Sequence, residues 1–369
     1  MPFSRHSIDA VKYDRNMATT QAKLKGLKWF DPGKAPFRLM GFPWYATDRV
    51  FRRMPLKPPA PLPEAVDNLA WHTSGGQVHF RTDSRHVVVR VKLRFKGGMP
   101  HMPRTGTCGC DLYIGPPGDK LYYHTTRFEP DTVAYEILLF EHTERRMREF
   151  TLNLPLYNGV DQLAIGVDRG CTVKPPRRYD DDRSVVIYGT SITHGGCASR
   201  PGMSYTNILS RRINVPFVNL GFSGSGQAEP EVARAIAAIP DPLLFVIDCE
   251  ANCCPPGTYE ARLPVFIDIL RAAHPQAAIL VLSRIPNATE NFQAPSRRAR
   301  LARVKFQREL VASRRRAGDN RIHFHDGSEL LEPDGHEGTV DTTHPNDTGF
   351  YHMAVNLEPI FKRILKGIR

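Results

Sequence analysis

Val185-Val-Ile-Tyr188 is an unbroken apolar run with Gly189 directly behind it, and Leu243-Leu-Phe-Val-Ile and Ala278-Ile-Leu-Val-Leu repeat the pattern further along the chain. Such runs are typical of strands that are buried on both faces of a sheet. Segments with helical periodicity separate them, and strands that alternate with helices form parallel sheets covered on both sides. This part of the chain therefore predicts an α/β fold. The other predicted strands are 217–220 and 321–324, and the predicted helices are 204–213, 229–238, 258–273, 295–317 and 347–367.

Residues 68–170 have a different pattern of apolar and polar residues. The segment 77–82 alternates apolar and polar residues, and 87–95 begins as a buried run and then alternates as well. Turn residues separate these short segments. Short strands at this spacing predict an antiparallel β-sandwich or jelly roll. The remaining strands expected here are 112–114, 134–140, 149–154 and 162–167.

A polar stretch with two prolines, 172–182, lies between these two patterns and predicts a domain boundary. Proline is dense over 55–63, which favours extended connecting chain over helix. We therefore expect an N-terminal extension over 1–65, a β-sandwich domain over 66–180 and an α/β domain over 181–369.

The net charge of the 369-residue chain is +12, which raises the question of nucleic acid. The densest basic cluster, 297–316, carries Leu301, Val304 and Leu310 at helical spacing, and so it is interpreted as the solvated face of a helix. Hydrophobic residues make up 41% and charged residues 24% of the chain, as in ordinary globular proteins. We expect no nucleic acid as a partner, while attraction to acidic polysaccharides stays open.

The seven cysteines are an odd number, which excludes complete intrachain pairing. Cys108-Gly-Cys110 and Cys253-Cys254 lack a second cluster at zinc-finger spacing, so we expect free buried thiols and no metal site. Met1-Pro-Phe-Ser-Arg begins no signal peptide, and no run approaches the roughly 20 apolar residues of a membrane span. The sequence thus predicts a cytoplasmic protein without a membrane partner, and its oligomeric state stays open.

Polar residues follow the predicted parallel strands where their carboxyl ends meet, which is where such sheets bind ligands. Ser191 comes directly after a strand and a glycine and is placed to act as a nucleophile, the alternative being a turn or N-cap serine. Gly224, in the glycine-rich run 219–226, lets a backbone N–H approach a ligand, although plain turn chemistry also explains it. Asn252 offers an amide donor for an oxyanion or is an ordinary loop residue.

Asp341-Thr-Thr-His344 lies just before the last predicted helix. Three-residue spacing lets one short loop present both side chains, so that the carboxylate can orient the imidazole and stabilise its charged form. Capping of the last helix by Asn346 or Asp347 is an alternative that is compatible with this one.

Taken together, these blocks resemble the SGNH, or GDSL-type, hydrolases. Ser191 matches the nucleophile of block one, Gly224 the glycine of block two and Asn252 the asparagine of block three, while Asp341 and His344 match the Asp-x-x-His of block five. The sequence departs from the general pattern at three positions: Thr190 replaces an aspartate, and Glu250 and Cys253 replace the Gly and Asp that flank the block-three asparagine.

A second motif is similar to one subgroup of that family. Bacterial two-domain members carry Gly-x-Asp-Leu-Tyr in an N-terminal β domain, and this chain has Gly109-Cys-Asp111-Leu-Tyr113 in its predicted β region. The resemblance implies a flavodoxin-like three-layer SGNH hydrolase domain, with a parallel sheet, behind an antiparallel β-sandwich or jelly-roll domain.

The resemblance also implies a chemistry. Ser191, His344 and Asp341 would form the catalytic triad, with an oxyanion hole of the Ser191 and Gly224 N–H groups and the Asn252 side chain. No cofactor and no metal is required. The expected substrate is a small-molecule or oligosaccharide ester, acetyl esters of carbohydrates first, and the alternative is a non-catalytic carbohydrate-binding protein on an esterase scaffold. Three further side chains are candidates for substrate binding: His194, Glu250 and Arg284.

Overall fold

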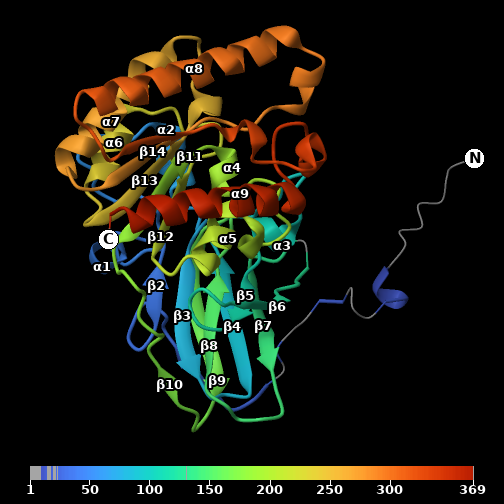
Figure 1. Cartoon of the computed structure of the whole chain (residues 1–369). Coiled ribbons are helices and arrows are strands. Elements are labelled where there is room, and N and C mark those ends of the chain that lie inside the picture. The colour runs from blue at the N-terminus through green and yellow to red at the C-terminus, as the bar shows by residue number, and fades with distance from the viewer. Residues whose placement is uncertain (1–9, 15–17, 20–21, 23, 130, 369) are drawn as a thin grey trace, which may run out of the picture.

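The computed structural model of the chain describes residues 10–14, 18–19, 22, 24–129 and 131–368. Its C-terminal half is built on a five-stranded sheet with the order β12-β11-β13-β14-β15, in which every pairing is parallel (Figure 1). Counted along the chain this order is 2-1-3-4-5, the flavodoxin-like arrangement, and the predicted fold class is therefore confirmed. The strands are β11 (Ser184–Gly189), β12 (Phe217–Gly221), β13 (Pro242–Asp248), β14 (Ala278–Leu282) and β15 (Ile322–His325).

Helices cover both faces of this sheet, which explains why its strands are apolar without alternation. In β14, Ile279 and Val281 belong to one core cluster, whereas Leu280 and Leu282 belong to the cluster on the opposite face. The second cluster lies under α5 (Tyr205–Arg212) and α9 (Asp347–Lys366). The first lies under α6 (Pro230–Ala237), α7 (Thr258–Ala273) and α8 (Ala294–Arg316).

Residues 27–174 form two antiparallel sheets that enclose a core of their own, as predicted for a sandwich (Figure 1). Phe80 of one sheet stacks on Phe150 of the same sheet at 5.3 Å, and both rings share the core with Val89 of the other sheet. The first sheet consists of β1 (Leu27–Phe30), β9 (Val160–Asp168), β4 (His86–Leu93) and β7 (Ala134–Glu141). The second consists of β10 (Val173–Lys174), β3 (Gln77–Thr82), β8 (Arg148–Asn153), β5 (Asp111–Ile114) and β6 (Leu121–Thr125), with β2 (Arg38–Met40) beside β3.

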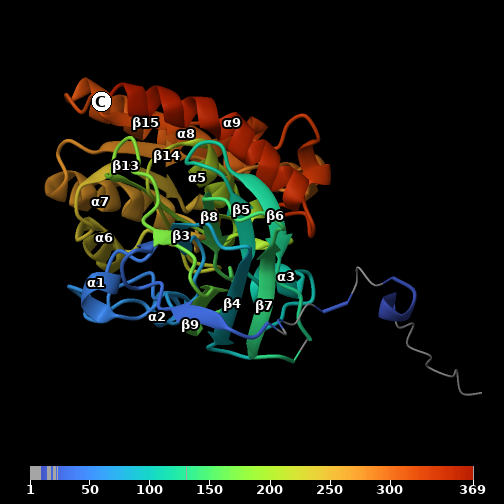
Figure 2. The ribbon, with the colours of Figure 1, turned by 90° about the horizontal axis from the view of Figure 1, so that it is seen from below.

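Part of the segment 1–65, predicted to be an extension, contributes to both halves of the molecule. β1 pairs with β9 and β2 pairs with β3. These strands were missed because each is only three or four residues long and half-buried, so that no alternation develops. Met54 and, just beyond the segment, Val66 of α2 (Glu64–Leu69) pack into the core under α6, and Figure 2 shows α2 on that side. The domain boundaries themselves stay a prediction.

Short helices carry the loops around the two ends of the sheets. No described helix is both long and apolar enough to cross a membrane. Residues 1–9, where no signal peptide was expected, lie outside the described residues. All seven cysteines are unpaired, and five of them are buried. The remaining elements are η1 (Ala10–Lys12), α1 (Tyr45–Asp48), α3 (Arg104–Thr107), α4 (Ser191–His194), η3 (Pro201–Met203), η4 (Glu250–Asn252), η5 (Ala288–Asn291), η6 (Gly327–Glu329) and η7 (Gly335–Gly338).

Candidate active site

Ser191 is the first residue of α4 and follows β11 after a single connecting residue, Thr190. The Thr190 side chain caps this helix by accepting a hydrogen bond from the Ile192 N–H at 3.3 Å. A side chain at Gly189 would place its Cβ 2.0 Å from Thr193 Oγ1, so only glycine permits this tight turn. The strand-to-helix turn thus holds the Ser191 hydroxyl at the carboxyl edge of the sheet, where its residue is 8% exposed.

His344 lies beside that hydroxyl although it is 153 positions away in the chain. Its Nε2 lies 2.8 Å from Ser191 Oγ, and its Nδ1 lies 2.7 Å from Asp341 Oδ2. The three predicted side chains therefore form one continuous hydrogen-bonded row. Since Asp341 Oδ2 accepts from Nδ1, the other ring nitrogen is free to accept the serine proton.

The loop 341–344 owes its shape to the Asp341 carboxylate. Its Oδ1 accepts hydrogen bonds from the backbone N–H groups of His344 at 2.8 Å and Thr343 at 3.2 Å, while Thr342 has a left-handed φ of 71°. Burial raises the pKa of the Asp341 carboxyl, but the hydrogen bonds from His344 outweigh it and hold that pKa below its ordinary value. Asp341 is therefore a carboxylate at neutral pH. Asn346, just beyond, caps α9 as the compatible alternative predicted.

A second segment, around Asn287 and Ala288, holds this loop in place through hydrogen bonds. Asn287 Nδ2 donates to Thr343 Oγ1 at 2.6 Å, and the Ala288 N–H donates to the Thr342 carbonyl at 2.9 Å. The helix η5 that begins there is held in turn by an ion pair of 2.7 Å between Glu290 Oε1 and Arg284 Nη2. The position of the histidine loop thus depends on residues that follow β14.

The loop that carries Gly224 lies directly against the nucleophile turn. The Phe222 N–H donates to the Gly189 carbonyl at 2.9 Å, and a Cβ on Gly226 would lie 2.1 Å from that same oxygen. Gly224 itself has a left-handed φ of 69°. Within the described residues its N–H meets no acceptor, so it is available to a ligand.

Asn252 is the last residue of η4, four positions after β13 ends at Asp248. Because β13 is the neighbour of β11 and Asp248 pairs with Gly189, this loop also starts beside the nucleophile turn. No hydrogen bond within the described part of the chain uses the side-chain amide of Asn252, and its Oδ1 is buried without a partner. An unpartnered amide at this place is suited to bind a ligand.

The candidate substrate-binding residue His194 is fully buried. Its ring stacks on Tyr157 at 4.1 Å, and its Nε2 lies 2.8 Å from the Leu156 carbonyl. Burial lowers the pKa of His194 well below its ordinary value, so the ring is neutral. Because the ring is fully buried between the α/β part and the sandwich, it has no access to a substrate in this structure.

Glu250 and Arg284, the other two candidates, contact each other. The Glu250 carboxylate accepts from the Arg284 N–H at 3.0 Å and from Gln307 Nε2 at 2.8 Å, and Arg284 Nε lies 3.5 Å from its second oxygen. Glu250 is 1% exposed, and burial raises its pKa. These two side chains connect the loop of Asn252 with η5 and are turned toward protein groups.

Two residues of the sandwich reach the site without having been predicted. The Tyr157 hydroxyl donates to the Ser191 carbonyl at 3.3 Å, and His101 Nε2 lies 3.6 Å from Asp341 Oδ2. Neither residue stands in a motif, because Tyr157 comes just after the predicted strand 149–154 and His101 lies in a loop. Only the packing of one half of the molecule on the other reveals them.

The doubly wound sheet brings a hydroxyl, an imidazole and a carboxylate together at its carboxyl edge, an arrangement that suits nucleophilic attack on an acyl group. Residues 182–362 match the model of the GDSL-like lipase/acylhydrolase family. Residues 27–173 match a model named GxDLY, described as the N-terminus of SGNH-hydrolase-type esterases. The chain belongs to the GDSL-like lipase/acylhydrolase family, which confirms the resemblance seen in its sequence.

Solved structures cover both halves of the chain. A GDSL-like lipase from Bacteroides ovatus ATCC 8483 is 30% identical, covers 92% of this chain and 98% of its own, and has a TM-score of 0.84. The salicylyl-acyltransferase SsfX3 from a tetracycline biosynthetic pathway (20% identity, 93% and 98% covered, TM-score 0.70) shares the fold. So does a family two carbohydrate esterase from Cellvibrio japonicus (14% identity, 93% and 99% covered, TM-score 0.60). No curated protein matches the chain significantly.

Proposed function

We propose that the chain is a serine esterase that removes small acyl groups, acetyl first, from carbohydrate hydroxyls through an acyl-enzyme on Ser191. The observation that carries this proposal is the hydrogen-bonded row from Ser191 Oγ through His344 to Asp341, with distances of 2.8 and 2.7 Å. Both distances lie within the range that direct proton transfer requires.

The proposed reaction has two halves. His344 Nε2 takes the proton of Ser191 Oγ while that oxygen attacks the ester carbonyl, and the protonated ring then delivers the proton to the leaving alcohol. A water molecule, deprotonated by the same nitrogen, then attacks the acyl-enzyme and releases the carboxylic acid. Asp341 keeps the ring in the correct tautomer and stabilises its charged form.

The developing oxyanion needs donors that are already in place. The N–H of Ser191, as the first residue of a helix, has no intrahelical acceptor, and the Gly224 N–H and the side-chain amide of Asn252 have no partner in the described chain. Donors that are paired with nothing else cost no reorganisation when charge appears. We assign the oxyanion hole to these three groups.

The backbone beside the nucleophile is closely packed at Gly196. A Cβ on Gly196 would lie 2.8 Å from the Tyr157 hydroxyl, 3.1 Å from the Ser191 carbonyl and 3.4 Å from His344 Cδ2. The carbohydrate alcohol rests on likeness of fold to carbohydrate esterases of family two, one of them from Clostridium thermocellum in complex with cellohexaose.

The test is hydrolysis of p-nitrophenyl acetate, followed by acetate release from a panel of acetylated oligosaccharides. Ser191→Ala and His344→Ala should each lower kcat by about 10⁴-fold or more. The matched controls are Ser313→Ala, on the exposed side of α8, and His336→Ala, in η7. Wild-type turnover no faster than that of Ser191→Ala would support the non-catalytic carbohydrate-binding alternative instead.

A further inference from the structure

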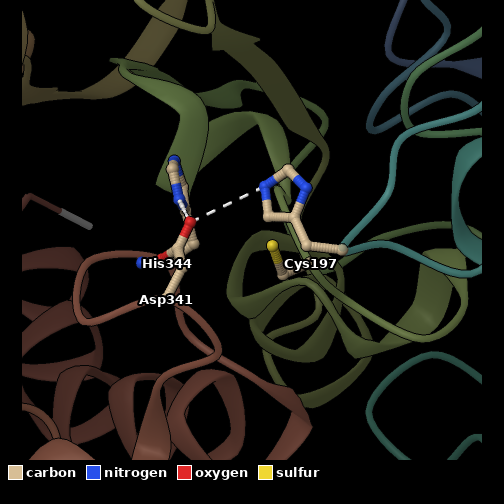
Figure 3. A group of neighbouring side chains, drawn as sticks. Cys197, Asp341 and His344 are labelled. Atoms are coloured by element: carbon tan, nitrogen blue, oxygen red, sulfur yellow. Dashed lines mark hydrogen bonds and ion pairs between the residues drawn. The ribbon is translucent and has the colours of Figure 1, made fainter.

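Four side chains with metal-binding atoms converge on the outer side of the proposed triad. They are His101, Cys197, Asp341 and His344, and one ligand atom from each lies within 4.8 Å of every other. Figure 3 shows the side chains of Cys197, Asp341 and His344 gathered at one place. Three separate segments of the chain supply them, which is why local spacing of cysteines and histidines predicted no such site.

The two oxygens of Asp341 have different surroundings. Oδ1 is occupied by two backbone N–H groups, of Thr343 and His344. Oδ2 lies between two imidazoles, 2.7 Å from His344 Nδ1 and 3.6 Å from His101 Nε2. The carboxylate is therefore fixed by one oxygen and presents the other to a pair of nitrogen ligands.

The other two ligands are held by the contact between the sandwich and the α/β part. Cys197 is buried, adopts a left-handed φ of 75°, and donates its N–H to Met102 Sδ at 3.4 Å. His101 sits in a tight turn closed by a bridge between Met99 and Met102. Thr105 Oγ1 also donates to the Ser199 carbonyl at 2.6 Å, so two hydrogen bonds join the segment 101–105 to the Cys197 loop.

We propose that these four side chains form a binding site for a zinc ion, and that an ion bound there switches off the esterase. Two imidazoles, a thiolate and a carboxylate are a ligand set that Zn²⁺ accepts in tetrahedral geometry. Bond lengths of about 2.0–2.3 Å place tetrahedral ligands roughly 3.3–3.8 Å apart, so the widest separation has to close by about 1 Å. The half-buried His101 side chain is placed to make this movement by rotation. Binding releases the Cys197 thiol proton to solvent and changes no oxidation state.

The consequence for activity follows from the shared ligands. An ion on Asp341 Oδ2 and a ring nitrogen of His344 replaces either the hydrogen bond to Asp341 or the one to Ser191. In both cases the imidazole can no longer act as the base. This inhibition rests on the proposed function, whereas zinc binding itself does not.

Binding is tested first, on the full chain freed of metal by a chelator. Competition between the protein and a chromophoric chelator should show one equivalent of Zn²⁺, and Co²⁺ in its place should give a thiolate-to-cobalt charge-transfer band. His101→Ala and Cys197→Ser should each weaken zinc binding about tenfold or more, and Cys197→Ser should abolish the band. Cys254→Ser and His336→Ala, an exposed thiol and an exposed imidazole elsewhere, should change neither.

Three outcomes overturn the site: no zinc bound by the wild type, no charge-transfer band, or loss of binding in Cys254→Ser rather than in Cys197→Ser. Should Cys197→Ser fail to fold, His101→Ala still decides, because the His101 side chain is partly exposed and lies outside the cores.

Inhibition is then measured as the zinc concentration that halves ester turnover, relative to the zinc-free rate of each variant. That concentration should rise about tenfold or more in His101→Ala, and a chelator should restore full turnover of the wild type. Binding of one zinc ion through Cys197 without any ester hydrolysis would support the metal site and refute the proposed function. An active esterase that neither binds zinc nor is inhibited by it would refute the metal site and leave the proposed function unaffected.

Discussion

The carboxylate of Asp111 lies 2.7 Å from Arg200 Nη1, although the two residues stand on different halves of the molecule and 89 positions apart. Asp111 is the aspartate of the Gly-x-Asp-Leu-Tyr motif and is fully buried in β5. Its Oδ2 also accepts the Gly202 N–H at 2.8 Å, and its Oδ1 accepts Asn153 Nδ2 at 2.7 Å. The motif therefore joins the sandwich to the segment that follows the nucleophile helix.

Replacing Asp111 by alanine should lower the free energy of unfolding by about 3–5 kcal/mol, because the Arg200 charge would then be buried without its partner. The measurement is urea unfolding, read as midpoint and slope. Asp161→Ala is the control, since the ion pair of Asp161 with Arg94 has the same 2.7 Å length but is exposed, and such pairs contribute only about 0–1 kcal/mol. Equal losses in the two variants would argue against a special role for the interface.

Asn252→Ala should lower kcat about 10²–10³-fold and leave KM nearly unchanged, because the amide is proposed to bind charge that exists only in the transition state. Steady-state kinetics on p-nitrophenyl acetate separates the two constants. Asn320→Ala, at the opposite end of the sheet, serves as the matched control. A rise in KM at constant kcat would assign Asn252 to ground-state binding instead.

Arg284 should act as a positioning residue, because it links the loop of Asn252 to η5, which fastens the histidine loop. We expect Arg284→Ala to lower kcat about tenfold or more with little change in KM, as small misplacements of catalytic groups do. Arg284→Lys keeps the positive charge and should restore part of the lost kcat. The rescue should stay incomplete, since one ammonium cannot pair with both Glu250 and Glu290 in a forked geometry. The exposed Arg308→Ala is the control, and an unchanged kcat in Arg284→Ala would refute the link.

Asp248 should make stability depend on pH. Burial raises the pKa of its carboxyl to about 7, with the Glu250 charge adding to this and hydrogen bonds from Tyr205 and Thr193 opposing it. Between about pH 4 and pH 7 the folded chain keeps a proton that the unfolded chain has lost, so this group's contribution to stability falls as pH rises, by up to about 1.4 kcal/mol per pH unit.

The corresponding test compares urea unfolding of the wild type and Asp248→Asn at several pH values from about 5 to 8. Asparagine keeps an acceptor for Tyr205 and Thr193 but does not titrate. The variant should gain stability relative to the wild type as pH rises, and all other titrating groups cancel in the difference. Parallel curves for the two proteins would contradict the raised pKa.

The secondary structure of the α/β half was readable from the chain because its signals are local. The helix predicted over 258–273 and the strand predicted over 278–282 coincide with α7 and β14. A helix buries one stripe and a doubly covered strand buries every residue, so periodicity alone separates the two. The same reasoning failed for β6, whose residues 121–123 are exposed and show no alternation, since its pairing depends on β5.

The candidate site shows the same difference between residues with local sequence signals and residues placed by tertiary packing. Ser191 and Asn252 could be proposed from the chain because the carboxyl ends of parallel strands meet at one edge, so residues that follow those strands become neighbours. His344 could be proposed from its three-residue spacing to Asp341. Packing of the sandwich onto that edge brought Tyr157 and His101 to the triad, buried His194, and placed Asp111 against Arg200. Contacts within the α/β half, with Arg284 and Gln307, turned Glu250 away from any substrate. Contacts between segments this far apart leave no periodic trace in either segment, since they depend on how two complete surfaces fit together.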